Sequence, residues 1–258
     1  MTRLFAAGER ALLLDSKGRR YLITLAEGAS FHSHAGFFAH DDLIGCQEGT
    51  TVRTGSGARY LAVRPTLPDF VLKMPRGAQV IYPKDLGQIL LLADIFPGAR
   101  VVEAGVGSGA LSMTMLRAGA HVSGYEIRAD FAERARANVE SFLGAEALSR
   151  YSVREANIYE GMVETDLDRV VLDLPEPWQV VPRAAGAMRP GAIFLAYLPT
   201  INQTATLREA LAEHPFVLAE TLEVLLRTWH VEGRSVRPDH RMVAHTGFLT
   251  HARYIGPV

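Results

Sequence analysis

The sequence predicts an α/β fold with a mostly parallel sheet, together with a small N-terminal β domain. Two observations predict it. From about Ile89 onward, short apolar strands alternate with helical stretches, and this alternation is typical of a parallel sheet covered on both faces. Before that point the chain shows short alternating runs and many glycines, which are typical of short strands and turns. We therefore expect two domains, residues 1–70 and 71–258.

The expected elements follow in chain order. In the first domain, residues 20–25 and 60–63 show the alternation of side chains that is typical of strands, and the glycines between them mark turns. Pro65 and Pro68 mark the end of the domain. In the second domain we expect strands at 100–104, 122–126, 152–155, 169–173 and 192–198. Helices should start near Gly109, Ala129, Val180 and Gln203. Two further strands are expected, at 216–226 and at 244–253, the last as an edge strand.

Composition excludes several classes of protein. With 258 residues, of which 48% are hydrophobic and 21% charged, the chain is globular. No apolar run approaches the ~18 residues of a membrane span, and no signal-peptide pattern is present. Cys46 is the only cysteine, so an internal disulfide is impossible and a cytoplasmic location is expected. The net charge of −1 argues mildly against a nucleic-acid partner, although nearly all basic residues are arginines, which suit phosphate contacts.

A glycine-rich turn follows the strand at 100–104 and precedes a helix. Such a turn lets a ligand approach the backbone and the free N–H groups of the helix start. The pattern Gly105-x-Gly107-x-x-Ala110 fits a dinucleotide, whereas Gly105-x-Gly107-x-Gly109 fits an S-adenosylmethionine loop. Glu103 favours S-adenosylmethionine, because a carboxylate there can hold its ammonium group but would repel a pyrophosphate.

Acidic and amide side chains end the next two strands. Glu126 is placed to accept hydrogen bonds from ribose hydroxyls in either cofactor class. After the third strand, Asn157 can accept a hydrogen bond from the adenine amino group of the cofactor. Glu155 is the other candidate, and the backbone is a third.

The fourth predicted strand ends in Asp173, followed by the sequence Leu-Pro-Glu-Pro-Trp. Because ligands lie outside the carboxyl ends of parallel strands, Asp173 should face the same crevice as the glycine turn. Enzymes that methylate amino groups and ring nitrogens often carry an Asp/Asn-Pro-Pro-aromatic loop here. The carboxylate would accept a hydrogen bond from the amino group next to the attacking nitrogen and stabilise the developing positive charge, and Trp178 would offer a stacking face. The alternative is an aspartate that caps a turn, with Trp178 as core packing.

These motifs together resemble the TrmI family of bacterial and archaeal tRNA (adenine-58-N1)-methyltransferases. The matching stretches run nearly the length of the chain: 36–45, 64–67, 74–76, 81–85, 103–111, 125–126, 173–178, 199–200, Gln203 and 245–249. The resemblance implies a class I (Rossmann-like) methyltransferase domain, N1-methylation of an adenine in the tRNA T-loop, and a homotetramer. Position 58 is the expected target, and whether the neighbouring adenine is also methylated is left open.

The resemblance also implies roles for individual residues. Asp173 matches the catalytic aspartate and also borders the cofactor, and Tyr82 matches a tyrosine near the target base. The cofactor site matches Glu103, Gly105, Gly107, Ser108, Gly109, Ala110, Leu111 and Glu126. Tyr82 would stack on a flipped adenine or donate a hydrogen bond near it, the alternative being a buried interdomain tyrosine.

Two other clusters have a less specific pattern. The histidines and aspartates His32, His34, His40, Asp41 and Asp42 match no zinc spacing, so we expect no metal and assign them to turns and loops. Arginines at 227–241 form the best basic patch, which contacts tRNA phosphates or is a solvated loop. His245 is expected to be structural, within a strand.

Two competing functions are compatible with parts of the sequence. An NAD(P)-dependent oxidoreductase would use the same glycine turn, and a non-catalytic RNA-binding protein would retain a relic cofactor site. The Asp173 loop argues against the first and the intact glycine turn against the second.

Overall fold

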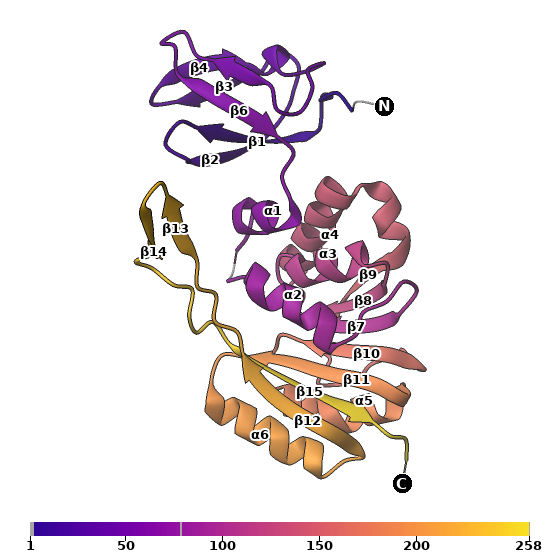
Figure 1. Ribbon diagram of the computed structural model, residues 1–258. Helices are drawn as coiled ribbons and strands as arrows, with labels where there is room; N and C mark the ends of the chain where they lie inside the picture. The colour runs from indigo at the N-terminus through magenta and orange to yellow at the C-terminus, as the bar shows by residue number, and fades with distance from the viewer. Residues whose placement is uncertain (1–2, 78, 258) are drawn as a thin grey trace. The chain divides into compact units, whose positions relative to one another are not determined.

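A computed structural model describes residues 3–77 and 79–257 (Figure 1). The chain divides into two compact units, Met1–Met74 and Pro75–Val258.

The first unit is built around a four-stranded antiparallel sheet in the order β2-β1-β6-β5. Its strands are β1 (Arg10–Asp15), β2 (Arg20–Thr24), β5 (Thr51–Arg53) and β6 (Arg59–Val63). A separate hairpin, β3 (Ser30–Ser33) and β4 (Gly36–Ala39), supplies Phe31 and Phe38, whose rings pack against the buried ring of Tyr60. This aromatic core confirms the small N-terminal β domain.

Helix α1 (Leu67–Lys73) was not expected from the sequence, because Pro65 and Pro68 resemble loop punctuation. At the start of the helix, the side chains of Thr66 and Asp69 each accept a hydrogen bond from the other residue's backbone N–H. Pro68 lies in the first turn, where a backbone N–H would have no partner within the helix, so the proline costs no hydrogen bond.

The second unit contains a seven-stranded sheet in the order β12-β15-β11-β10-β7-β8-β9. Its strands are β7 (Arg100–Ala104), β8 (His121–Glu126), β9 (Tyr151–Glu155), β10 (Leu167–Leu172), β11 (Met188–Leu198), β12 (Phe216–Glu223) and β15 (Phe248–Tyr254). The five strands β7 to β11 pair in parallel, and β15 runs antiparallel to both of its neighbours. The mostly parallel sheet is therefore confirmed.

The expectation of a C-terminal edge strand is wrong. Strand β15 lies between β11 and β12, and β12 is the edge. The alternating pattern suggested an edge strand, but Thr250 is fully buried and shares a hydroxyl hydrogen bond of 2.9 Å with Thr221 on β12.

Helices cover both faces of this sheet (Figure 1). On one face are α2 (Pro83–Leu92), α3 (Ala110–Arg117) and α4 (Ala129–Leu143), and on the other are α5 (Val181–Ala187) and α6 (Ile201–Ala212). The sheet supplies fully buried Val102, Val170 and Phe194 to the core beneath α5 and α6. Such two-sided burial accounts for the nearly continuous apolar strands of the sequence.

Between β12 and β15 the chain forms a two-stranded hairpin, β13 (Trp229–Glu232) and β14 (Ser235–Pro238). We call residues 225–243, which include this hairpin, the arm. It extends beyond the sheet (Figure 1), and Trp229, Val231 and Val236 are each more than half exposed. The arm contains the expected basic patch, of which Arg234 and Arg237 lie in the hairpin and Arg227 and Arg241 flank it.

Candidate functional site

The carboxyl ends of β7, β8 and β10 gather the acidic and glycine residues singled out in the sequence. The strand order reverses between β7 and β10, and crevices at such a reversal bind ligands in α/β sheets. The backbone N–H of Asp173 donates to the carbonyl of Ala104 at 2.9 Å, so the aspartate begins its loop directly beside the glycine turn. The structure therefore brings Asp173 and the turn together.

A β-carbon at either of two glycines of this turn would meet atoms of a neighbouring segment. Gly105 has φ +79°, and a β-carbon on it would overlap the carbonyl oxygen of Asp173. Gly109, with φ +82°, is the residue before α3, and a β-carbon on it would lie 3.2 Å from atoms of Ala135 in α4. The turn is thus packed between the Asp173 loop and α4, and the absence of side chains at these glycines permits that close packing.

The carboxylate of Glu126 fixes the turn from the side of β8. It accepts hydrogen bonds from the backbone N–H of Gly107 at 3.0 Å and of Arg128 at 3.1 Å. Glu126 and Gly105 both line a cavity of about 310 Å³. Its other walls are Ala104, Tyr125, Ile127, Ala156, Asn157, Ile158, Tyr159, Leu174 and Pro175.

Glu103 lies fully buried beneath the turn rather than in the wall of that cavity. One carboxylate oxygen accepts from the Ser112 hydroxyl at 2.6 Å, and the other has no hydrogen-bond partner among the described residues. Burial raises the pKa of Glu103 to about 8. The hydroxyl of Ser108, in the turn itself, is likewise buried and unpartnered in the described part of the chain.

This arrangement fits S-adenosylmethionine better than a dinucleotide. Glu103, Glu126 and Asp173 place three carboxyl groups around the turn, which favours a ligand with positive charge and hydroxyl donors. A pyrophosphate would bring only acceptors and negative charge to the same place. The sheet also differs from that of dinucleotide-binding folds, which is parallel throughout, because the antiparallel strand β15 lies inside it.

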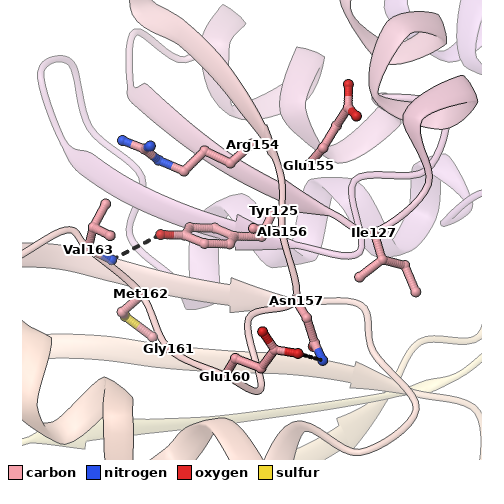
Figure 2. Close-up of a pocket in the computed structure, with 10 residues that line it drawn as sticks. All are labelled: Tyr125, Ile127, Arg154, Glu155, Ala156, Asn157, Glu160, Gly161, Met162 and Val163. Atoms are coloured by element: carbon pink, nitrogen blue, oxygen red, sulfur yellow. Dashed lines mark hydrogen bonds between the residues drawn. The ribbon is translucent and has the colours of Figure 1, made fainter.

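Asn157 and Glu155, the two side chains considered for the contact with the cofactor adenine, occupy different places. Asn157 borders both the 310 Å³ cavity and a more open one of about 940 Å³, which Figure 2 shows. Its side-chain oxygen accepts from the N–H of Tyr159 at 3.1 Å, and its amide donates to Glu160 at 3.2 Å. Glu155 lines the open cavity and not the 310 Å³ one, and its carboxylate points away from Asn157 (Figure 2).

Asp173 lines a second pocket, of about 470 Å³, and is absent from the wall of the 310 Å³ cavity. The other lining residues are Gln79, Val80, Ile81, Tyr82, Tyr197, Pro199, His245 and Thr246. The carboxyl group opens into this pocket but is otherwise densely surrounded, and burial raises its pKa from 3.8 to about 7. Tyr82 lines the same pocket.

Tyr197, His245 and Thr246 are pocket residues that sequence reasoning missed. Tyr197 lies at the end of β11, and burial raises the pKa of its hydroxyl to about 12. A β-carbon on Gly247 would overlap the Tyr197 ring, so this glycine allows the 245–249 segment to pack against it. The resemblance of residues 245–249 to the TrmI family was the one feature of the sequence that pointed to this side of the pocket.

His245 does not lie within a strand, contrary to expectation. It is in the segment before β15, where its two ring nitrogens are 2.9 Å from the carbonyl of Pro199 and from the carboxylate of Glu223. The Pro199 carbonyl first, and then Glu223, raise the pKa of His245, because both accept hydrogen bonds that stabilise the charged ring.

Trp178 and the N-terminal histidines take structural positions. Trp178 is partly buried and packs against the core on the α5–α6 face, which corresponds to the core-packing alternative. His40 and Asp41 accept hydrogen bonds from the backbone N–H groups of Ala26 and Gly28. Within residues 3–77 and 79–257, no cluster of three or more histidine, cysteine or acidic side chains could hold a metal ion. The same residues contain no helix long and apolar enough to cross a bilayer.

Comparison with known proteins places these features in one family. The family model described as "tRNA methyltransferase complex GCD14 subunit" matches residues 59–237, and a "TrmI-like N-terminal" model matches residues 4–52. A tRNA (adenine(58)-N(1))-methyltransferase TrmI of Thermus thermophilus is 40% identical over 94% of this chain and 95% of its own length. A Methanocaldococcus jannaschii TrmI, named for adenines 57 and 58, is 34% identical over 94% of each chain.

Solved structures agree on the fold. TrmI from Aquifex aeolicus superposes with a TM-score of 0.87 at 27% identity, covering 99% of this chain and 100% of that one. A Thermotoga maritima structure, described as an S-adenosylmethionine-dependent O-methyltransferase, gives a TM-score of 0.93 at 31% identity, covering 98% and 96%. The class I methyltransferase fold is therefore confirmed, and the oxidoreductase alternative is set aside. The chain belongs to the TrmI family of S-adenosylmethionine-dependent tRNA (adenine-58-N1)-methyltransferases.

Proposed function

We propose that this protein transfers a methyl group from S-adenosylmethionine to N1 of adenine 58 in the T-loop of tRNA. The observation that carries the proposal is the position of Asp173. Its backbone contacts the glycine turn, and its side chain lines the 470 Å³ pocket. A donor at the turn and a base in the pocket would therefore meet at this carboxyl group.

The cofactor site is assigned to the turn and the strand ends around it. S-adenosylmethionine, when bound, supplies a methyl group on a positively charged sulfur. Glu126 would accept hydrogen bonds from the ribose hydroxyls, and Glu103 would act on the ammonium group from beneath the turn, through water. Gly105, Gly107, Ser108, Gly109, Ala110 and Leu111 would form the surface on which the methionine part lies, and Asn157 would border the adenine.

Asp173 is assigned the catalytic role. Its carboxylate would accept a hydrogen bond from the exocyclic amine of the target adenine, which orients N1 toward the methyl group. As N1 forms its new bond, positive charge spreads over the base, and a fixed carboxylate in a densely packed site stabilises that charge. The reaction needs neither a metal nor a covalent bond to the enzyme.

Tyr82 is assigned to the base itself. N1 of adenine is hidden within base stacks, so the target must leave its stack to reach the pocket. Tyr82 and Tyr197 offer aromatic rings there, on which an extruded base gains stacking contacts.

The partner assignments follow from charge. With a net charge of −1, the chain needs local basic surfaces to bind tRNA, and the exposed arginines of the arm provide one. A homotetramer would join such surfaces from several subunits around one tRNA. A cytoplasmic enzyme would meet its tRNA substrate directly.

Methyl transfer to unmodified tRNA, followed by nucleoside analysis, tests the proposal. The purified protein with methyl-labelled S-adenosylmethionine should yield 1-methyladenosine, and a transcript with guanine at position 58 should remain unlabelled. Label in a 2′-O-methylated nucleoside, or label that persists in the guanine transcript at adenine 57 alone, would contradict the assignment of acceptor atom or position.

A further inference from the structure

The ammonium group of Lys84 is buried near the start of α2, two residues after Tyr82. Its side chain is 3% exposed and donates to three acceptors: the carboxylate of Asp85 at 2.8 Å, the carbonyl of Val224 at 2.7 Å and the hydroxyl of Thr246 at 2.5 Å. An ammonium group has three donors, so each has a partner here.

Asp85 completes a closed network. It is fully buried, and its second carboxylate oxygen accepts from the Thr246 hydroxyl at 2.6 Å. Thr246 therefore receives a hydrogen bond from Lys84 and donates one to Asp85. The N–H of Asp85 in turn donates to the carbonyl of Tyr82 at 2.9 Å, which ties the network to the residue before α2.

The two acceptors outside α2 lie on opposite sides of the arm in sequence. Val224 precedes residues 225–243, and Thr246 follows them. One buried cation therefore fixes both ends of the arm to the start of α2. Tyr82 and Thr246 also line the same 470 Å³ pocket as Asp173, so the fixed segments are pocket walls.

Stability alone is a weak reason for this network. A buried ion pair must recover the cost of removing two charges from water, and apolar replacements of similar volume often serve stability as well or better. Unlike apolar packing, hydrogen bonds are directional. Each hydrogen bond of the pair therefore fixes the position of one atom in a segment that lines the pocket.

We propose that Lys84 and Asp85 are positioning residues for methyl transfer. They hold the Thr246 side of the pocket at a fixed distance from Tyr82 and Asp173, and they couple the pocket to the position of the arm. This inference rests on the proposed function, since the base that the pocket would orient is the tRNA adenine.

Two variants test it without leaving a lone buried charge. Lys84→Met/Asp85→Asn removes both charges at similar volume, and Thr246→Val removes only the hydroxyl that both residues share. Thr204→Val on α6 is the matched control, because its hydroxyl is also buried and bonded to a backbone carbonyl, that of Thr200. We expect kcat on tRNA to fall about 10- to 100-fold in the first two variants, as for a misplaced substrate, with cofactor Kd unchanged. The control should retain wild-type kcat.

Hydrogen exchange separates this inference from the proposed function, because it needs no acceptor. Amides at 224–226 and 243–247 should exchange faster in both variants, and those at 103–111 should not change. If wild type makes no 1-methyladenosine while these amides still respond, the proposed function fails and the tie between arm and pocket stands. Unchanged exchange at the arm's ends, or a fall in cofactor affinity parallel to kcat, would overturn the positioning role.

Discussion

The carbonyl oxygen of Asp173 occupies the space that a β-carbon of residue 105 would need. Gly105 therefore does more than permit a turn with φ +79°. Its missing side chain allows the end of β10 to lie against the end of β7, and this close approach sets where the aspartate side chain begins. The cofactor turn and the catalytic loop are consequently one unit.

Gly105→Ala should abolish methyl transfer by pushing these two loops apart. Gly191→Ala is the matched control, because Gly191 in β11 has φ +87° but no atom within 4 Å of the added β-carbon. The control should lose only the ~1–2 kcal/mol of left-handed strain. Thermal unfolding and cofactor titration measure both effects. Equal activity in the two variants would show that methyl transfer does not depend on the close packing of residue 105 against Asp173.

Asp173→Asn should lower kcat at least ~10²-fold, because a neutral amide stabilises developing positive charge poorly. In wild type, kcat/KM should rise as pH increases through about 7, where the raised pKa leaves the carboxyl group ionised. The rise should be absent from the residual activity of the variant. A variant with the wild-type pH profile would assign the titration to another group.

The same variant should be more stable than wild type above pH 7. Burial raises the pKa of Asp173 from 3.8 to about 7, so ionisation disfavours the folded state, and stability falls between these pH values. Discounted for the water that reaches the pocket, the gain should be on the order of 1–3 kcal/mol at pH 8 and close to zero at pH 4. Denaturant unfolding at the two pH values measures it.

Cofactor binding should release protons near neutral pH. Burial raises the pKa of Glu103 to about 8 and that of Asp173 to about 7, so both carboxyl groups are partly protonated there. The positive charges of S-adenosylmethionine favour their ionised forms, and affinity should therefore increase from pH 6 to pH 8. Calorimetry in buffers of different ionisation enthalpy counts the protons. S-adenosylhomocysteine, which lacks the sulfonium charge, should release fewer.

Arg234→Ala/Arg237→Ala on the arm should weaken tRNA binding and reduce its dependence on salt. For each phosphate that the variant no longer neutralises, the slope of log K against log salt should fall by about 0.7 to 0.9. Arg183→Ala serves as the control, since Arg183 is exposed on α5, away from the arm. An unchanged slope in the arm variant would place the tRNA elsewhere.

The sheet was predictable because its strands are buried on both faces. Strand β7 has the predicted bounds, and α4 begins at the predicted Ala129. The glycine turn carries backbone requirements that few other residues meet, so sequence alone located it. Asp173 follows the end of β10 by one residue, which fixes its place at the crevice.

The far wall of the pocket was not predictable. Tyr197, His245 and Thr246 come from distant segments, and their proximity depends on β15 pairing between β11 and β12. The alternation of apolar and polar residues along a strand does not show which other strands will pair with it. The hydrogen bond between Lys84 and Thr246 spans 162 positions, and no local pattern encodes it.

The interior place of β15 constrains how the enzyme can be assembled. Of the seven strands in the sheet it is the last in sequence, yet two others depend on it for their hydrogen bonds. A nascent chain that has not reached Phe248 therefore exposes two unpaired strand edges and lacks one side of the pocket. The sheet can therefore be completed only after the end of the chain has emerged, and protection of the open edges by a chaperone would matter most until then.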